Sequence, residues 1–376
     1  MHTQIGAFNR TGKRIFDYDK DPDHATISDV SNISPYLVDA SDTVVTSRTS
    51  PLGDAPEIAF GSMANDGGYL LLEPQEQKVL LKAEPAAAQF IRPYYGPDEF
   101  IKGGKRFCLW LTDATPNQLR ALPAVMQRVE KVREERLKSK RPTTVELANT
   151  PTVFGEIRQP SRRYLAIPKT SSERRAYIPM AFLKPTDIAG ADLFTVPNAQ
   201  PFHFGVLTSK MHMAWVRYVC GRLKSDYRYS AGIVYNNFPW PSSPIAEQKQ
   251  RVEAAAKAVL DARAQFPDST LADLYDPLRT PPVLVKAHAE LDRAVDRCDR
   301  KEPFPSARAR VEYLFQLYEK LTAPLITAAQ PKRRGKGLYA QPPPAPSHPD
   351  LTPEKSYGDS AHYYSGKEEP PPYRTK

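Results

Sequence analysis

A short segment in the second half of the chain carries charged side chains at every second position. Residues 221–241 read GRLKSDYRYSAGIVYNNFPWP, where Arg222, Lys224, Asp226 and Arg228 alternate ahead of an apolar run and a Pro-Trp-Pro exit. Side chains two apart in an extended chain point to the same side. If residues 222–228 are extended, all four charged groups therefore lie on one face. Such a face predicts either a solvated strand edge or a surface that binds a polyanion.

The positive charge of the chain is concentrated around this segment. The 376 residues carry a formal net charge of +9. Residues 161–230 hold eleven Lys or Arg and four Asp or Glu, so seven of the excess positive charges fall within this stretch. Such uneven charge indicates a polyanionic partner such as nucleic acid, whereas ordinary surface lysines would be spread along the chain.

Other kinds of chemistry find little support in the residue pattern. Cys108, Cys220 and Cys298 are far apart and have no histidine at ligand spacing, so neither a disulfide framework nor a metal site is expected. The glycine-rich loops that bind phosphates or dinucleotides are not found in the sequence. His203 and His212 are interpreted as packing or hydrogen-bonding histidines.

One segment partly matches a catalytic motif. Enzymes that methylate the amino group of a flipped base use Asn or Asp, two prolines and an aromatic residue to hold and stack that base. Here Asn237-Phe238-Pro239-Trp240 has phenylalanine in place of the first proline. We therefore interpret the Pro-Trp-Pro segment as a junction between domains. A cryptic enzyme site formed by Asn237 with the two histidines is the alternative.

Local patterns predict a mixed α+β arrangement up to this junction. Residues 3–18 are expected to form a hairpin whose second strand is KRIFDY. Strands and loops are expected over residues 33–111, and FHFGVLTS at 202–209 also reads as a strand. Valines at helical spacing predict an amphipathic helix over residues 123–140, with its arginines on the solvent side. The segment KMHMAWVRYVCGRL at 210–223 fits a second helix.

The pattern becomes helical after Pro244. Residues 246–266, 282–298 and 307–321 carry apolar side chains at helical spacing, which predicts a small helical bundle. Residues 330–376 are proline-rich and are expected to form a disordered tail. No apolar run approaches the length of a membrane span and no signal-peptide core is found, so we expect a cytoplasmic protein without a membrane partner.

Many linked motifs together resemble one known family. They include FGSMANDGGYLLL, RVEKVREERLKSK, SSERRAYIPMAFL, HFGVLTSKMHMAW, GRLKSDYRYS, IVYNNFPWP and LADLYDPLRTPPVLVKAHAELDRAVD. Over roughly residues 1–325 the chain is similar to the C-terminal part of the MmeI-like family of type IIL restriction–modification proteins and related adenine-specific DNA methyltransferases. The resemblance implies trailing methyltransferase strands at 1–29, a DNA target-recognition domain at 30–241 and a C-terminal helical domain at 245–325, before the tail.

The resemblance also assigns roles to the charged segment. In this family the positions that match Lys224-Ser225-Asp226 carry base-reading side chains. Lys donates to guanine O6 and N7, and Asp accepts from the cytosine amino group, so the pair suits one G·C base pair. Arg228 would reach a neighbouring base, and a plain surface ion pair between Lys224 and Asp226 is the alternative. Phosphate contacts are expected from three arginines, Arg174, Arg175 and Arg222.

The function implied is sequence-specific DNA recognition for an adenine-N6 methyltransferase that uses S-adenosylmethionine. The family's cofactor motif and Asn-Pro-Pro-aromatic tetrad lie upstream and are absent here, so this chain alone is expected neither to bind the methyl donor nor to transfer the methyl group. Double-stranded DNA and a catalytic methyltransferase polypeptide are the expected partners. The alternatives are an inactive remnant of a truncated gene, and a stand-alone nucleic-acid-binding protein in which Tyr227 and Tyr229 stack on single strands.

Overall fold

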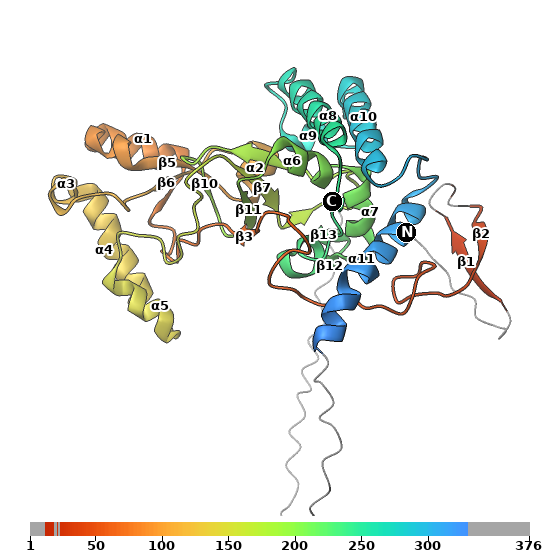
Figure 1. Ribbon diagram of the computed structural model, residues 1–376. Helices are drawn as coiled ribbons and strands as arrows, with labels where there is room; N and C mark the ends of the chain where they lie inside the picture. Colours follow the sequence, from red (N-terminus) through yellow and green to blue (C-terminus); the bar gives the residue numbers. More distant parts are fainter. Residues whose placement is uncertain (1–11, 19–20, 22, 330–376) are drawn as a thin grey trace, which may run out of the picture. The chain divides into compact units, whose positions relative to one another are not determined.

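The computed structural model describes residues 12–18, 21 and 23–329, which Figure 1 shows as a ribbon. The strands of these residues are short, and they are β1 Lys13–Asp17, β2 Thr26–Val30, β3 Ala59–Phe60, β4 Leu71–Leu72, β5 Ile91–Tyr95, β6 Phe107–Leu109, β7 Tyr164–Pro168, β8 Thr170–Ser171, β9 Ala181–Leu183, β10 Ile188–Ala189, β11 Leu193–Pro197, β12 Gly221–Leu223 and β13 Asp226–Arg228. The α-helices are α1 Pro74–Ala83, α2 Pro97–Lys102, α3 Pro116–Arg120, α4 Pro123–Leu137, α5 Pro142–Glu146, α6 Pro201–Leu207, α7 Lys210–Val219, α8 Ala246–Ala264, α9 Leu271–Leu274, α10 Pro282–Asp299 and α11 Ala307–Ala329.

The strands combine into small sheets that interleave distant parts of the sequence. Two four-stranded sheets have the orders β10-β5-β6-β4 and β3-β11-β7-β9, and a three-stranded sheet has the order β12-β13-β8. β10 joins β5 in parallel, while β3 and β7 flank β11 in antiparallel register. Because β5 pairs with β10 and β3 pairs with β11, each across roughly a hundred residues or more, the strand-rich part folds as one interlocked unit.

The N-terminal strand has a partner that the sequence analysis did not predict. β1 lies antiparallel to β2, with Lys13 opposite Val30 and Asp17 opposite Thr26. KRIFDY is therefore paired with the strand that follows it, whereas the predicted partner lies outside the described residues. Residues 1–11 lie outside the described residues, and the assignment of residues 1–29 to a methyltransferase domain stays a prediction.

Several segments that were expected to be strand or loop are helical. α1 and α2 lie within residues 33–111, and each begins at a proline with a glutamate two residues later. The predicted strand FHFGVLTS is instead α6 followed by its cap, because Pro201 opens the helix and His203 accepts from the backbone N–H of Gln200. Gly205 lets this helix approach α8 closely, since a Cβ there would lie 2.8 Å from a methyl carbon of Val252.

Helix α4 confirms the predicted valine face but not the predicted arginine face. Val125, Val129 and Val132 are buried, as their spacing indicates. Arg136 is also buried and donates five hydrogen bonds of 2.7–3.0 Å to backbone carbonyls. The acceptors belong to Ala64, Asn65, Leu147, Thr150 and Val153. Buried carbonyls need donors, so this one guanidinium fixes two loops that no sheet orders.

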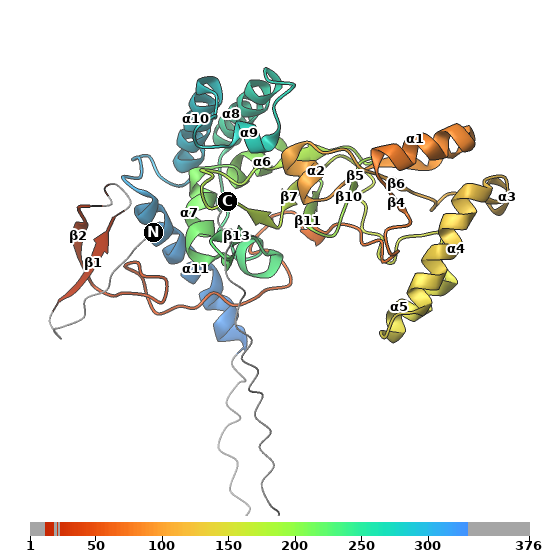
Figure 2. The same cartoon turned by 180° about the vertical axis from the view of Figure 1, so that it is seen from behind.

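The C-terminal helices share their core with the strand-rich part. α8 and α10 lie side by side, as Figures 1 and 2 both show, and α8 also packs on α6. α11 packs on α7, where Trp215 lies 5.4 Å from Phe315 and 5.7 Å from Tyr318 between ring centroids. One hydrophobic cluster therefore runs from Phe204 and Trp215 to Leu291 and Phe315. The helices do not form a bundle with a core of its own.

The predicted α+β fold class is confirmed. A mixed part rich in short strands precedes a helical part, in the order that the sequence predicts. Residues 330–376, for which a disordered tail was expected, lie outside the described residues. Among the helices that the structure describes, none is long and apolar enough to cross a membrane.

Replacing Arg136 tests whether its five hydrogen bonds support the fold. Arg136→Lys keeps the charge but can replace at most three of the five hydrogen bonds, so we expect a loss of about 3 kcal/mol in the free energy of unfolding. Urea denaturation followed by circular dichroism measures this loss. Arg133→Lys on the exposed side of the same helix is the control and should change stability by less than about 0.5 kcal/mol. Equal effects of the two substitutions would contradict the assignment.

Candidate nucleic-acid interface

The charged segment forms a tight hairpin and not a continuous strand. β12 and β13 pair antiparallel, with Arg222 opposite Tyr227 and Leu223 opposite Asp226. Lys224 and Ser225 form the connection, and Lys224 has a φ of +55° in the left-handed region. Lys224 is therefore presented at the exposed tip, with Asp226 at the first position of the returning strand.

The hairpin overturns the prediction that four charged side chains share one face. Asp226 and Arg228 are two apart on β13 and do share a face. Arg222 is paired across the hairpin with Tyr227 and lies on the other face. Its guanidinium lies 4.1 Å from the Tyr227 ring centroid and donates to the backbone carbonyl of Ser225 at 3.0 Å. Arg222 thus stabilises the hairpin connection, and its expected phosphate contact remains untested.

Buried tyrosines hold the hairpin on the protein body. Tyr227 and Tyr229 are only 4% and 2% exposed. Tyr229 shares a 3.0 Å hydrogen bond with His212, and its backbone N–H donates to the carbonyl of Lys169 at 2.8 Å. These rings are therefore not available to stack on bases in this structure, contrary to the single-strand alternative. The apolar run after them is also not the expected strand, because residues 231–235 form a π-helical turn capped by Ser230.

The edge of the neighbouring sheet adds two cations and an aromatic ring that the sequence did not single out. Lys169 places its Nζ 4.4 Å from the ring centroid of Phe60, and the guanidinium of Arg158 lies 5.6 Å from the same ring. Burial lowers the pKa of Lys169; Arg228 and Arg158 lower it further, while Asp192 opposes them. These groups are therefore close in space. Phe60 remains 44% exposed at an edge strand.

Two groups of side chains lie on neighbouring sheets: Lys224, Asp226 and Arg228 on the hairpin, and Lys169, Arg158 and Phe60 at the sheet edge. Arg228 connects the two groups, because it shares a face with Asp226 and also donates to the side chain of Thr170 at 2.7 Å, next to Lys169. The sequence feature that could have indicated Lys169 is its position immediately after the buried strand β7, where a long side chain can extend from the core to the surface.

The other expected phosphate ligands lie beside the hairpin. Arg174 is exposed in the loop that follows β8, and Arg175 is partly buried in the same loop. Burial lowers the pKa of the Arg175 guanidinium, whereas the carboxylates of Asp226 and Asp276 favour its charged form. Asp226 accepts from the backbone N–H of Glu173 at 3.3 Å. In the part of the chain that the structure describes, no ion pair joins Lys224 to Asp226, so the ion-pair alternative is not realised.

Two of the candidate catalytic residues, Asn237 and His212, are buried inside the fold. The amide nitrogen of Asn237 donates to the carbonyls of Thr46 and Gly232 at 2.9 and 2.7 Å, and its oxygen accepts from the hydroxyl of Tyr318 at 3.3 Å. Burial lowers the pKa of His212 to about 3, so the ring is neutral. No group of three or more His, Cys, Asp or Glu side chains within the described residues could hold a metal ion. These observations favour the structural interpretation of the Pro-Trp-Pro segment.

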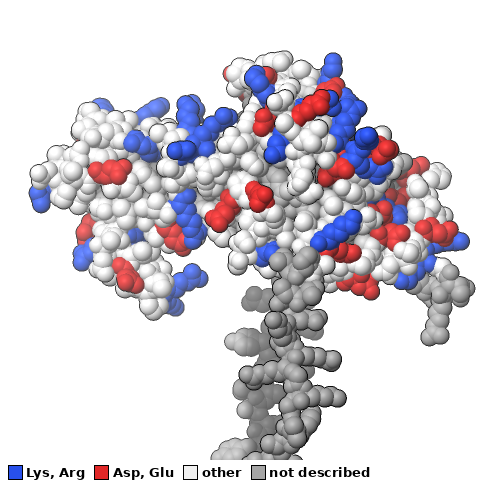
Figure 3. Space-filling view, viewed as in Figure 1, with Lys and Arg blue, Asp and Glu red and all other residues white. Residues whose placement is uncertain are grey.

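Positive charge is also exposed away from residues 161–230. On the face seen in Figure 3, Lys and Arg side chains gather around α2 and over α10, where Asp and Glu are interspersed. On this face, exposed positive charge is therefore not confined to residues 161–230. The arrangement around Lys224 is distinguished by its geometry and not by the amount of charge.

The acid sensitivity of folding should reveal the buried histidine. The pKa of His212 is near 3 in the folded chain and near 6.5 when unfolded, so the unfolded state binds more protons as the pH falls below about 6.5. Its contribution is complete above that pH and is lost at about 1 kcal/mol per pH unit on acidification. Stability measured from pH 7.5 to 4.5 should therefore fall more steeply for the native chain than for His212→Gln. Parallel pH profiles would show that His212 is not buried as described.

Comparison with known proteins gives the following matches. The model for the MmeI target recognition domain matches residues 39–242, and the model for the MmeI C-terminal domain matches residues 245–326. The chain is 39% identical over 293 residues to DNA methyltransferase A of Bacillus subtilis (strain 168), a match that covers 78% of this chain and 33% of that protein. A solved structure of the type IIL restriction–modification enzyme MmeI in complex with DNA aligns with a TM-score of 0.76 and 40% identity, covering 84% of this chain and 42% of that one. The chain thus spans less than half the length of both relatives.

Proposed function

Since this chain belongs to the MmeI family, carrying its target recognition and C-terminal domains, we propose that it recognises a specific sequence in double-stranded DNA for an adenine-N6 methyltransferase. The observation that carries this proposal is the position of Lys224 and Asp226 at the exposed tip of a hairpin that buried tyrosines anchor on the protein body. A rigid support of this kind is what direct readout of base edges requires. The solved MmeI complex contains DNA, which supports the choice of duplex DNA as the ligand.

Each residue of the proposed interface has a separate role. Lys224 donates to guanine and Asp226 accepts from the cytosine amino group of one G·C pair. Arg228 reads an adjacent base, together with Lys169 from the neighbouring sheet. Phosphate contacts come from Arg174, Arg175 and Arg222, which set the position on the duplex without selecting bases.

Methyl transfer belongs to a catalytic methyltransferase polypeptide that supplies S-adenosylmethionine. No glycine-rich cofactor loop is found in the sequence, and the amide of Asn237, the candidate for holding a target base, is bonded to internal partners. No step of methyl transfer is therefore assigned to the side chains of this chain. The burial of Tyr227 and Tyr229 argues against a protein that stacks on single strands.

The proposal is tested by purifying the full chain from its host and assaying co-purified proteins for adenine methylation of host DNA. A co-purifying methyltransferase that becomes sequence-specific only in the presence of this chain supports the proposal. Sequence-specific binding is measured in parallel by selection from a pool of random DNA duplexes. A chain with no partner and no sequence preference would instead be an inactive remnant.

Exchanging the two reading residues should invert the preference at one base pair. In Lys224→Asp/Asp226→Lys the donor and the acceptor change places, so G·C should be replaced by C·G at a single position of the selected sequence. A good base contact contributes about 1–3 kcal/mol, so the preference should shift by roughly tenfold to a hundredfold. Competition binding between duplexes that differ at this position measures the shift. A uniform loss of affinity for all duplexes would contradict a reading role.

A further inference from the structure

A six-residue segment bridges the β12–β13 hairpin, which carries the proposed base-reading residues, and helix α10 of the C-terminal domain. It runs from Ser172 to Tyr177, between β8 and the chain that leads to β9. At its start, Ser171 of β8 is paired with Tyr227 of the hairpin. At its end, Tyr177 is buried against α10. The segment therefore touches both the proposed base reader and a helix that belongs to the other domain.

The first half of the segment is a β-turn that holds Asp226. The backbone N–H of Arg175 donates to the carbonyl of Ser172 at 3.2 Å, which closes a turn with Glu173 at its second position. The backbone N–H of Glu173 is directed outward from this turn and donates to Oδ1 of Asp226 at 3.3 Å. One carboxylate oxygen of the proposed reader is thus fixed, and the other is left for a ligand.

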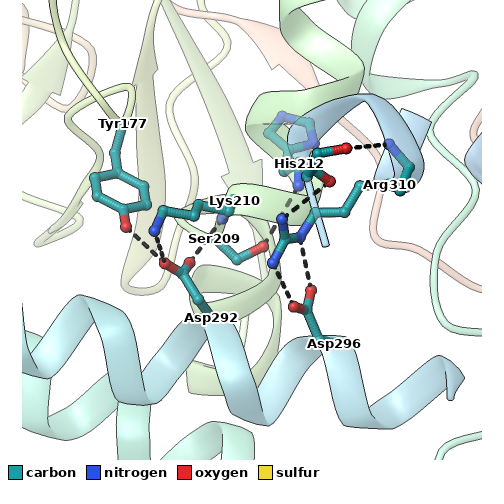
Figure 4. Close-up of polar contacts among 9 residues, drawn as sticks. Tyr177, Ser209, Lys210, His212, Asp292, Asp296 and Arg310 are labelled. Atoms are coloured by element: carbon teal, nitrogen blue, oxygen red, sulfur yellow. Dashed lines mark hydrogen bonds and ion pairs between the residues drawn. The ribbon is translucent and has the colours of Figure 1, made fainter. Parts of the chain in front are cut away.

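The second half of the segment is anchored on α10. The hydroxyl of Tyr177 donates to Oδ2 of Asp292 at 2.7 Å, and its ring stacks on His288 with centroids 4.0 Å apart. Oδ1 of Asp292 accepts from the backbone N–H of Lys210 at the start of α7, also at 2.7 Å (Figure 4). Asp292 is buried, and burial raises its pKa while both hydrogen bonds favour the charged form. The anchor is therefore a fixed point of the core.

We propose that α10 takes part in base selection by positioning Asp226, through Tyr177 and the turn at Ser172–Arg175. This inference rests on the proposed function, in which Asp226 accepts from a cytosine amino group. Glu173 and Tyr177 act here as positioning residues, because neither is itself directed at a base.

The physical reason is the rotational freedom of an aspartate on a short strand. Asp226 is partly exposed, and a free carboxylate would sample several side-chain rotamers. A hydrogen bond from a backbone N–H selects one of them, and base contacts discriminate only when they are held in register. Arg175 adds to this constraint, since it lies within electrostatic reach of both Asp226 and Asp276 of the C-terminal domain.

Two substitutions at Glu173 test this positioning role. Glu173→Pro deletes the backbone N–H that donates to Asp226, and proline is well accommodated at the second position of such a turn. Glu173→Ala removes the same side chain but keeps the N–H, so it is the matched control. The binding of full-length variants is measured on two duplexes that differ only at the base pair altered by the Lys224/Asp226 exchange.

The expected result is a loss of discrimination without a loss of general affinity. Glu173→Pro should reduce the preference at this base pair about fivefold, the effect of one hydrogen bond, while Glu173→Ala keeps it. Tyr177→Phe should produce a smaller reduction of the same kind. Tyr235→Phe is its control, because the Tyr235 hydroxyl donates to the carbonyl of Pro56, away from the turn.

The remaining outcomes separate the two proposals. If the native chain discriminates and Glu173→Pro discriminates equally well, the positioning role is wrong and the proposed function stands. The positioning role is also wrong if Glu173→Pro weakens binding to both duplexes equally. If the native chain shows no sequence preference, alone or with its methyltransferase partner, the proposed function fails and the positioning role fails with it. Melting temperatures of all variants identify any loss of fold.

Discussion

Trp215 fills the space between the recognition part of the chain and its C-terminal helix. The ring is fully buried against Phe315 and Tyr318 of α11, and its indole N–H donates to the carbonyl of Val234 at 3.0 Å. The β12–β13 hairpin begins directly after α7, which carries Trp215, and is followed by the turn that contains Val234. Both ends of the hairpin are therefore fixed by one side chain, and the rigidity of its tip depends on packing contributed by the C-terminal domain. In this chain the recognition part and the C-terminal helices therefore share one packed core around this ring.

Arginine serves two distinct purposes in this molecule. Arg136 satisfies loop carbonyls, Arg263 donates to the hydroxyl of Tyr275 and the carbonyl of Met180, and Arg310 pairs with Asp296. These cations hold the fold and do not face a ligand. Net charge therefore overstates the positive charge at the surface, because Arg136 and Arg263 are buried. A tip residue such as Lys224 contributes little to the total but is presented without an internal partner among the described residues.

The sequence predicted features that depend on local repetition and missed those that depend on distant contacts. Val125, Val129 and Val132 were placed correctly because a helix repeats its buried face. The same pattern could not place Arg136 inside, since its acceptors lie up to 72 residues away in the sequence. Alternating charges around Lys224 looked like a strand because the connection contains no glycine or asparagine to signal a turn. Lys169 was missed because only the folding of β3 against β11 brings Phe60 beneath it.

The left-handed backbone at Lys224 limits which side chains the tip of the hairpin can carry. Unbranched side chains, aspartate and asparagine tolerate a positive φ, whereas valine, isoleucine and threonine are strained there. Under the proposed function, position 224 can therefore carry the polar side chains that contact guanine, cytosine or adenine edges. Threonine, whose methyl group could contact a thymine methyl group, is strained there. The conformation of one residue thus restricts which side chains can contact a base from the tip of the hairpin.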